Sequence, residues 1–328
     1  MKKLSSHLPK FLEYLEIEKN RSKKTIENYN FYLTRFIGWF GDKKPEQITF
    51  ENVRKYKLWL ARLIDVHGEP LKINTQNYHL IALRSFLKYL AKCNVKTLAP
   101  KKIELTKTPN REVVFIEGND LNKLLEAPML INKNKSKNES AKLMMYRDKA
   151  ILELLFSTGL RVSELANLKI KNVNIKKNEF SVMGTDKKTR TVLLSEQAKY
   201  WVNEYITNRK DSNPYLFISH DKRTSNTKTL KQKNKKTKLE IEDKPLTPRS
   251  IQRIVQKYAR TTGITKPVTP HTLRHSHATN LLQNGTDIHN VQTMLGHSSI
   301  NTTQIYTYIA DKKLRDIHKK YHGKKKSR

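Results

Sequence analysis

The sequence of 328 residues contains a single cysteine, Cys93. One cysteine excludes a disulfide framework and any zinc site built from several thiolates, and the simplest compartment for such a chain is the reducing cytosol. No apolar run approaches the roughly 18 residues that a membrane-spanning helix requires. Residues 1–19 begin with basic side chains, but glutamates interrupt the apolar positions, which predicts an amphipathic helix rather than a signal peptide. We therefore expect a cytoplasmic protein that does not enter a membrane.

Acidic residues are scarce relative to basic ones. The chain holds 65 Lys and Arg residues against 30 Asp and Glu residues, which gives a formal net charge of +35. This excess is larger than solubility requires, and such a surface usually binds a polyanion: nucleic acid, or less often an acidic membrane. The length is typical of about two domains, each large enough to bury its own core. We therefore expect a two-domain protein whose partner is nucleic acid.

Apolar residues recur at steps of three and four along the first 94 residues, which predicts a small bundle of four helices. The helical segments span residues 8–15, 22–40, 50–64 and 75–92. Ser22 or Thr25 is suited to cap the second segment, and Gly41 to end it. Residues 95–111 contain two prolines and little helical period, so we expect an extended linker there. The two domains are then residues 1–94 and 112–328.

The second domain combines helical and alternating patterns. Helical periods cover residues 119–126, 146–157 and most of the chain from 247 onward. Residues 173–195 alternate between apolar and polar side chains and predict a small antiparallel meander. Two polar stretches, 131–142 and 219–245, lack an apolar period and are predicted to be insertions. The predicted fold class is mainly α with a small antiparallel β-sheet.

Four short segments carry side chains suited to chemistry. They are STGLRVSEL at 157–165, VMGTDKKTRTVLL at 182–194, HTLRHSHATNLL at 271–282 and MLGHSSINTTQIYTYIA at 294–310. In the first segment, we expect one helix to end at Gly159 and another to begin near Arg161, which places a guanidinium beside helix N-terminal amides and makes an anion site. In the last segment, Gly296 ends a helix, His297 lies at the turn, and the next helix carries Tyr306.

The third segment places His271 and Arg274 three residues apart, on one face of a helix. His271 and His275 also have the spacing of some metal sites, but no carboxylate or thiolate lies nearby in the sequence to complete the ligand set. Each segment alone has an ordinary structural explanation, such as a surface arginine, an amphipathic helix or a solvated hairpin tip. Together, two arginines, two histidines, a hairpin lysine and a late tyrosine supply what phosphoryl transfer without a metal needs.

The ordered set STGLRVSEL, HTLRH and LGHSSINTTQIY closely resembles the tyrosine recombinase and integrase family, and its Xer-type members most of all. The spacing of nine residues from His297 to Tyr306 matches that family. Residues 77–92 look like the last long helix of the family's N-terminal core-binding domain, so the resemblance covers nearly the whole chain. It implies a SAM-like helical core-binding domain and an α+β catalytic domain that form a C-shaped clamp on DNA.

The resemblance also implies roles for individual residues. Arg161 and Arg274 would clamp the scissile phosphate, and His271 would assist proton transfer. His297 would hydrogen-bond a phosphate oxygen. Tyr306 would be the nucleophile, forming a 3′-phosphotyrosyl link and freeing a 5′-hydroxyl. Because attack by the partner strand's 5′-hydroxyl reverses this step, the resemblance implies no metal, no ATP and no other cofactor.

The chain departs from the family at the hairpin. Xer-type hairpins usually place the catalytic lysine directly after the glycine, where this chain has Thr185. Some family members place the lysine later in this turn, so the resemblance implies Lys187 as the general acid, with Lys188 as the alternative. Only one of them can face the leaving oxygen, because adjacent residues on a strand point to opposite sides. Glu164 and His275 match family positions that we take to be supporting rather than catalytic.

The predicted function is site-specific recombination of double-stranded DNA. In this prediction, a homotetramer binds the paired half-sites, and the DNA strands are exchanged through a Holliday junction intermediate.

Residues 312–328 carry nine basic residues, one acidic residue and a short apolar stripe. Family members dock this last helix on a neighbouring protomer, and packing on its own domain is the alternative. Two other functions are alternatives, a type IB topoisomerase and a non-enzymatic architectural DNA-binding protein, and the ordered motif set favours the recombinase. The sequence leaves open the target DNA, a role in chromosome dimer resolution or in integration and excision, and a paralogous or accessory activator.

Overall fold

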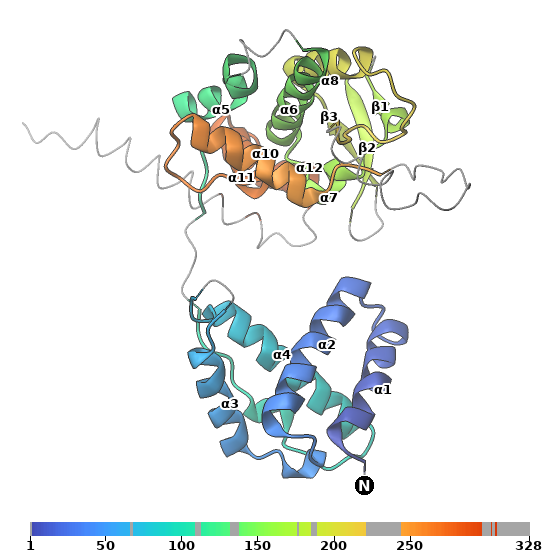
Figure 1. Ribbon diagram of the computed structural model, residues 1–328, viewed down its shortest axis with the longest axis vertical. Helices are drawn as coiled ribbons and strands as arrows, with labels where there is room; N and C mark the ends of the chain where they lie inside the picture. The colour runs from blue at the N-terminus through green and yellow to red at the C-terminus, as the bar shows by residue number, and fades with distance from the viewer. Residues whose placement is uncertain are drawn as a thin grey trace, which may run out of the picture. The chain divides into compact units, whose positions relative to one another are not determined.

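The computed structural model of the protein describes residues 2–65, 68–108, 113–131, 138–175, 177–184, 189–220 and 244–296, together with positions 303 and 306. The chain divides into two compact units, Met1–Arg111 and Glu112–Arg328 (Figure 1). Lys187, Lys188, His297, most of the 219–245 insertion and everything after Tyr306 lie outside the described residues. None of the helices in the described ranges is long and apolar enough to cross a membrane.

The first unit is a bundle of four helices, as the apolar periodicity predicts. The helices are α1 Leu4–Ile17, α2 Lys23–Phe40, α3 Phe50–Arg62 and α4 Ile73–Lys92, with a short 3₁₀ helix, η1, at Pro45–Gln47. Ser22 caps α2 by accepting a hydrogen bond from the N–H of Thr25, and α2 ends at Gly41. Both α1 and α3 pack against α2 and α4, so the predicted second helix and its ends are confirmed.

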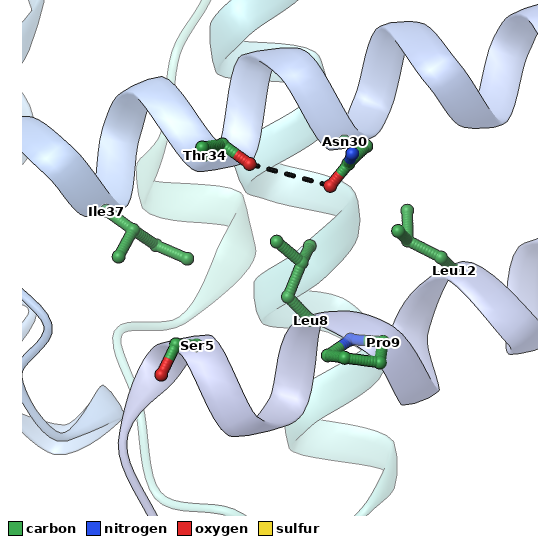
Figure 2. A pocket seen from close by; sticks show the side chains of 7 residues that line it. All are labelled: Ser5, Leu8, Pro9, Leu12, Asn30, Thr34 and Ile37. Atoms are coloured by element: carbon green, nitrogen blue, oxygen red, sulfur yellow. Dashed lines mark hydrogen bonds between the residues drawn. The ribbon is translucent and has the colours of Figure 1, made fainter.

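Aromatic rings fill much of the interior of this bundle. The ring of Phe36 meets that of Tyr56 edge-on with centroids 5.0 Å apart, and Phe11 lies 5.2 Å from Phe86. All four side chains are almost completely buried. A shallow, mostly apolar hollow of about 250 Å³ lies between α1 and α2 (Figure 2), and no residue of the four motif segments lines it.

The segment predicted as a linker packs on the first unit over its described part, residues 95–108. It contains a short 3₁₀ helix, η2, at Pro100–Lys102, and Ile103 is fully buried in the bundle core. The Asn77 amide donates to Thr106 O at 2.8 Å and accepts from Thr106 N at 3.0 Å, while Arg84 Nη2 donates to Ile103 O at 2.8 Å. Side chains of α4 thus satisfy backbone groups that an extended segment leaves unpaired.

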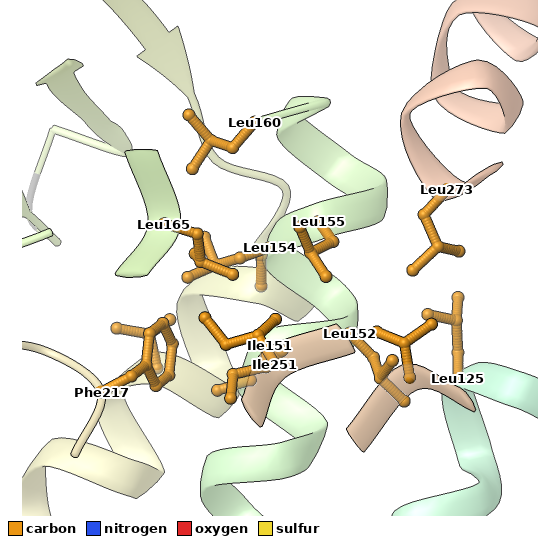
Figure 3. Packing of buried hydrophobic residues seen from close by; sticks show 14 of the residues in the cluster. Leu125, Ile151, Leu152, Leu154, Leu155, Leu160, Leu165, Phe217, Ile251 and Leu273 are labelled. Carbon is orange, nitrogen blue, oxygen red and sulfur yellow. The ribbon is translucent and has the colours of Figure 1, made fainter. Parts of the chain in front are cut away.

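The second unit is built around α6, Glu139–Thr158. The other helices are α5 Gly118–Ile131, α7 Val162–Ala166, α8 Glu196–Thr207, α10 Pro248–Thr261, α11 Pro270–Gln283 and α12 Ile288–Leu295, with a 3₁₀ helix, η4, at Ile170–Asn172. α6 packs against α5, α8, α10 and α11. Ile151, Leu152, Leu154 and Leu155 are fully buried on it (Figure 3), so α6 is enclosed by its neighbours.

Two helices of the second unit, α5 and α6, are longer than their periodicity predicts. α5 continues to Ile131, past the predicted end at Glu126. α6 begins at Glu139 instead of Tyr146, with Asn138 accepting a capping hydrogen bond from Ser140 N. The prediction of an insertion over 131–142 is therefore wrong at both ends. Its residues after 138 are polar because they form the first, exposed turn of a capped helix, which periodicity does not distinguish from a loop.

The predicted antiparallel meander is confirmed. Its strands, in the order β1-β2-β3, are β1 Val173–Asn174, β2 Glu179–Met183 and β3 Thr189–Leu193. Phe180 pairs with Val192, and both side chains are buried. Because side chains alternate along a strand, the pairing of Val182 with Arg190 puts Arg190 on the same inward face.

Capping residues fix where the last described helices begin and end. Thr247, Thr269 and Asp287 each accept a hydrogen bond from a backbone N–H in the first turn of α10, α11 and α12. α12 ends at Gly296, whose φ of 65° is in the left-handed region that favours glycine. The predicted helical pattern from residue 247 is confirmed as far as its break at Gly296. α11 carries the third motif segment, and α12 carries the start of the fourth.

Candidate active site

The turn between α6 and α7 positions the first motif arginine. Gly159 ends α6 with a φ of 59°, and a Cβ there would lie 2.8 Å from side-chain atoms of His277 and Leu295, so only glycine fits. Arg161 precedes α7, and its backbone N–H donates to Glu164 Oε2 at 2.9 Å while its Nη1 donates to Oε1 at 3.0 Å. The predicted break and restart of the helix are confirmed.

Three consecutive carbonyls at the end of α12 accept hydrogen bonds from three arginines. Arg190 Nε donates to Met294 O at 3.2 Å, Arg274 Nη2 to Leu295 O at 2.8 Å and Arg161 Nη2 to Gly296 O at 3.0 Å. The last carbonyls of a helix lack intrahelical partners and carry partial negative charge, which favours cations there. The end of α12 therefore brings together one arginine from β3, one from α11 and one from the start of α7, which we call the arginine cluster.

The arginine cluster carries more positive charge than its direct contacts neutralise. Glu164 is shared between Arg161 and Arg190, at 3.0 and 2.8 Å. Arg274 donates to two backbone carbonyls and is only 3% exposed. Burial, and then the proximity of Arg161, lower the pKa of Arg274 to about 10, so it stays protonated at neutral pH. Three guanidinium groups beside one carboxylate suit an anion with several oxygens.

Two neutral imidazoles on α11 adjoin the cluster. Burial, followed by the charges of Arg274 and Arg161, lowers the pKa of His271. Burial, followed by His271 and Arg274, lowers the pKa of His275 to about 4. Both rings are therefore uncharged at neutral pH, a state in which one ring nitrogen accepts a hydrogen bond. No group of three histidine, cysteine or acidic side chains in the described part of the chain is arranged to hold a metal ion.

The motif tyrosine contacts one of these imidazoles. The Tyr306 hydroxyl lies 2.7 Å from His275 Nδ1. Its side chain is 2% exposed and packs with Ala278, Val291 and Leu295. Burial raises the pKa of Tyr306, and the positive charge of Arg274 lowers it in part. The phenol is therefore protonated at neutral pH and lies within the electrostatic reach of the cluster.

Four predicted site residues, Arg161, His271, Arg274 and Tyr306, are brought to one region of the second unit by these contacts and charges. Lys187, Lys188 and His297 lie outside the described residues. The motif segments thus come from α7, α11 and the residues after α12, far apart in the sequence.

Arg190 was not among the predicted site residues, although it lies inside the second motif segment. Its side chain is largely buried and touches both Glu164 and the end of α12. A signal was present: in an alternating strand, Arg190 shares the face of the buried Val192. An arginine on the inward face of a strand needs partners inside the domain.

Two family models match the chain. Residues 114–313 match the phage integrase family, and residues 8–94 match the phage integrase N-terminal SAM-like domain. The chain is 33% identical over 314 residues to the tyrosine recombinase XerD of Lacticaseibacillus casei, covering 95% of this chain and 97% of the relative. It is also 33% identical over 317 residues to the tyrosine recombinase XerA of Pyrococcus horikoshii, covering 95% and 92% of the two chains.

The fold is similar to that of a solved DNA complex. The crystal structure of the XerH site-specific recombinase bound to a palindromic difH substrate, a post-cleavage complex, matches with a TM-score of 0.68. The match covers 97% of this chain and 85% of the XerH chain at 22% identity. The mainly α fold with a small sheet is thus shared across the length of this chain.

Proposed function

This chain belongs to the phage integrase family as a Xer-type tyrosine recombinase, and from that premise we propose that its candidate site cuts and rejoins duplex DNA through a covalent bond to Tyr306. The strongest support for this role is the set of groups at the end of α12. The end of α12 gathers Arg161 and Arg274 on adjacent carbonyls, and Tyr306 lies beside the same helix. A phosphodiester requires this combination of fixed positive charge and a buried oxygen nucleophile when no metal takes part.

The proposed cleavage step conserves atoms and charge. Arg161 and Arg274 bind the non-bridging oxygens of the scissile phosphate. The Tyr306 oxygen attacks phosphorus, its bond to phosphorus forms as the bond to the 5′-oxygen breaks, and a 3′-phosphotyrosyl link remains. The phenol proton passes to the neutral imidazole of His275, which contacts the hydroxyl and so takes a more direct role than the supporting one expected from the sequence. His271 assists from beside the arginines. Attack by a 5′-hydroxyl of the partner strand runs the same step backwards.

The leaving 5′-oxygen needs a proton, and we propose Lys187 as its donor, with Lys188 as the alternative. We also propose that His297 contacts the scissile phosphate. A 5′-bridging phosphorothiolate has a leaving group that needs no proton. The Lys187→Ala variant should therefore cleave this substrate at close to the normal rate, whereas Lys188→Ala should show no such rescue. Rescue of Lys188→Ala alone would reverse the assignment, and equal behaviour of the two variants would exclude a single general acid in the hairpin.

Recombination is distinguished from relaxation by where the strands rejoin. Two differently labelled duplexes with paired half-sites, drawn from the host chromosome and from mobile DNA, are incubated with the full chain. A recombinase yields duplexes that join strands of both labels. A type IB topoisomerase yields relaxed plasmid without exchanged strands, and an architectural DNA-binding protein yields neither product. The class of site that recombines also separates chromosome dimer resolution from integration and excision.

Assembly is proposed as a tetramer in which the C-terminal residues 312–328 dock on a neighbouring protomer. A chain truncated at Asp311 should then bind one half-site but fill the second without cooperativity, and strand exchange should be lost. Normal recombination by the truncated chain would exclude docking in trans. A truncated chain that no longer folds would indicate packing of the tail on its own domain.

A further inference from the structure

We propose that Arg190 is a positioning residue for DNA cleavage: by sharing Glu164 with Arg161, it keeps the charge of Arg161 available to the scissile phosphate. This inference rests on the function proposed above. It concerns a residue of β3 that lies outside the six predicted site residues.

Arg190 binds Glu164 through both terminal nitrogens of its guanidinium. Nη1 donates to Oε1 at 3.0 Å and Nη2 to Oε2 at 2.8 Å. The side chains are 12% and 5% exposed, so water weakens the pair little. A bidentate pair of this kind fixes the plane of the carboxylate as well as its position.

Arg161 uses the same two carboxylate oxygens, through its backbone N–H and its Nη1. Burial raises the pKa of Glu164, but hydrogen bonds from Arg190 and Arg161 outweigh this, so its pKa lies below the usual value and the carboxylate is charged. One negative charge therefore serves two guanidinium groups. Without Arg190, the whole carboxylate charge would fall on Arg161, and a phosphate would have to compete with Glu164 for it.

The same arginine also fixes the other partner of Arg161. Arg190 Nε donates to Met294 O at 3.2 Å. A Cβ on Gly296 would lie 3.0 Å from Arg190 Cδ, so the side chain lies directly against the backbone whose carbonyl accepts Arg161 Nη2. Arg190 thus spans Glu164 and the end of α12, and both contacts that hold the Arg161 guanidinium depend on it.

The test compares two substrates in single-turnover formation of the covalent adduct at saturating DNA. One nicked duplex carries a normal phosphate at the scissile position, and the other carries a neutral methylphosphonate, which needs less positive charge. Arg190→Met should slow cleavage of the phosphate by about 100-fold, the scale expected for a misplaced catalytic group. It should slow cleavage of the methylphosphonate much less and leave the half-saturating DNA concentration unchanged. Adding Glu164→Gln to Arg190→Met should recover part of the lost rate.

Arg147→Met is the matched control in the same unit. Arg147 is also buried, binds a carboxylate through two nitrogens and donates to a carbonyl, in its case Asp148 and Ile218 O. Its loss should lower stability and slow both substrates by the same factor. If Arg190→Met does not fold, Arg190→Lys, which keeps one charge, should show the same substrate pattern with a smaller loss.

The inference would be overturned if the Arg190 variants cleaved both substrates more slowly by the same factor and Glu164→Gln recovered none of the lost rate. Arg190 would then have a structural role only. The proposed function fails differently, because the unaltered chain would then form no Tyr306-dependent adduct on the phosphate substrate.

Discussion

The interior of the first unit is apolar and aromatic, whereas that of the second also holds charges. Among the described residues of the first unit, the buried polar side chains are Asn77 and His79. The second unit buries a larger charged set: Arg147, Asp148, Lys149, Glu153 and Arg274. Both interiors hold helices together, but charges in the second must find partners, because an unpaired buried charge is costly.

The buried charges of the second unit fall into two kinds. Arg147 pairs with Asp148, and Lys149 pairs with Glu153, both on α6. Arg274 instead donates to backbone carbonyls and has no ion pair among the described residues. Charges with carboxylate partners stabilise the fold, whereas the charge held by dipoles alone keeps its capacity to attract an anion. The comparison therefore distinguishes buried charges that are paired with carboxylates from the one that we propose binds an anion, and the predictions below test that distinction.

The largest expected effect is on Arg274. Arg274→Ala should reduce the rate of covalent adduct formation at saturating DNA by about 10²–10³-fold, the scale seen when a fixed charge is removed from a transition state. DNA binding should persist because it draws on many other phosphate contacts. The measurement is single-turnover cleavage of a nicked duplex, with binding followed by gel shift at low and high salt.

Arg84→Ala in the first unit is the control for this effect. Arg84 also donates to a backbone carbonyl, that of Ile103, but it has no place in the candidate site. Its loss should lower the melting temperature while the saturated cleavage rate is kept. Equal losses of cleavage in the two variants would remove the distinction between the units.

The next effect is on stability. Lys149→Met should lower the free energy of unfolding of the second unit by about 3 kcal/mol, because Glu153 is then left buried without its partner at 2.8 Å. Lys149→Met combined with Glu153→Leu should recover most of the loss. Urea unfolding followed by Trp201 fluorescence, in a chain with Trp39→Phe and Trp59→Phe, reports on the second unit alone.

Lys92→Met provides the contrast in the first unit. Lys92 lies 2.7 Å from Glu18, a shorter distance than that between Lys149 and Glu153, but both of these side chains are more than half exposed. Water and salt already screen this pair, so its loss should not change the unfolding midpoint of the first unit, followed by the fluorescence of Trp39 and Trp59 in a chain with Trp201→Phe. If Lys92→Met destabilised the chain as much as Lys149→Met, then distance and not burial would determine how much each ion pair contributes to the free energy of unfolding.

The smallest effect concerns pH. Burial is the first cause that lowers the pKa of His220, His275 and His277 to about 4 in the second unit. Because the unfolded chain binds protons near pH 6.5 and the folded unit does not, stability is complete above pH 6.5 and is lost as pH falls toward 4. For His277, the most buried of the three, this linkage should lower the free energy of unfolding by about 1–2 kcal/mol between pH 7 and pH 5. His220 and His275 should contribute less, because solvent screens them more.

His277→Gln should make this pH dependence less steep, whatever it does to stability at pH 7. The measurement is urea unfolding at both pH values with the Trp201 reporter. The first unit, followed by Trp39 and Trp59 in a chain with Trp201→Phe, should lose less stability, because the pKa values of His7 and His79 are lowered less. An unchanged slope in His277→Gln would mean that His277 titrates normally in the folded chain.

The same contrast explains which parts of the molecule were predictable. In the first unit, apolar and polar positions follow one helical period, so all four helices and the ends of α2 were predicted. In α6, the first turn after Asn138 has no apolar period, so the start of the helix was misplaced. Further along, Arg147, Lys149 and Glu153 occupy buried positions, so charge no longer marks the exposed face. The packing of residues 95–108 was missed because it depends on Asn77 and Arg84, side chains distant in sequence.

The candidate site was predictable where an ordered motif carried it. Arg161, Arg274 and Tyr306 were found from their segments, but the way they are held was not. Carbonyls at the end of α12 bind the arginines, and a carbonyl leaves no mark in a sequence. Nor does sequence alone show that His275 contacts the Tyr306 hydroxyl, since this contact joins α11 to a residue beyond α12.

The identity of the nucleophile is tested most directly by trapping the adduct on a nicked duplex that loses its free 5′ end after cleavage. Digestion and mass spectrometry should place the nucleotide on the peptide that contains Tyr306. Tyr306→Phe should bind the duplex and form no adduct, whereas Tyr308→Phe should form it normally. An adduct that persists in Tyr306→Phe, or that disappears only in Tyr308→Phe, would contradict the assignment of the nucleophile and the site built around it.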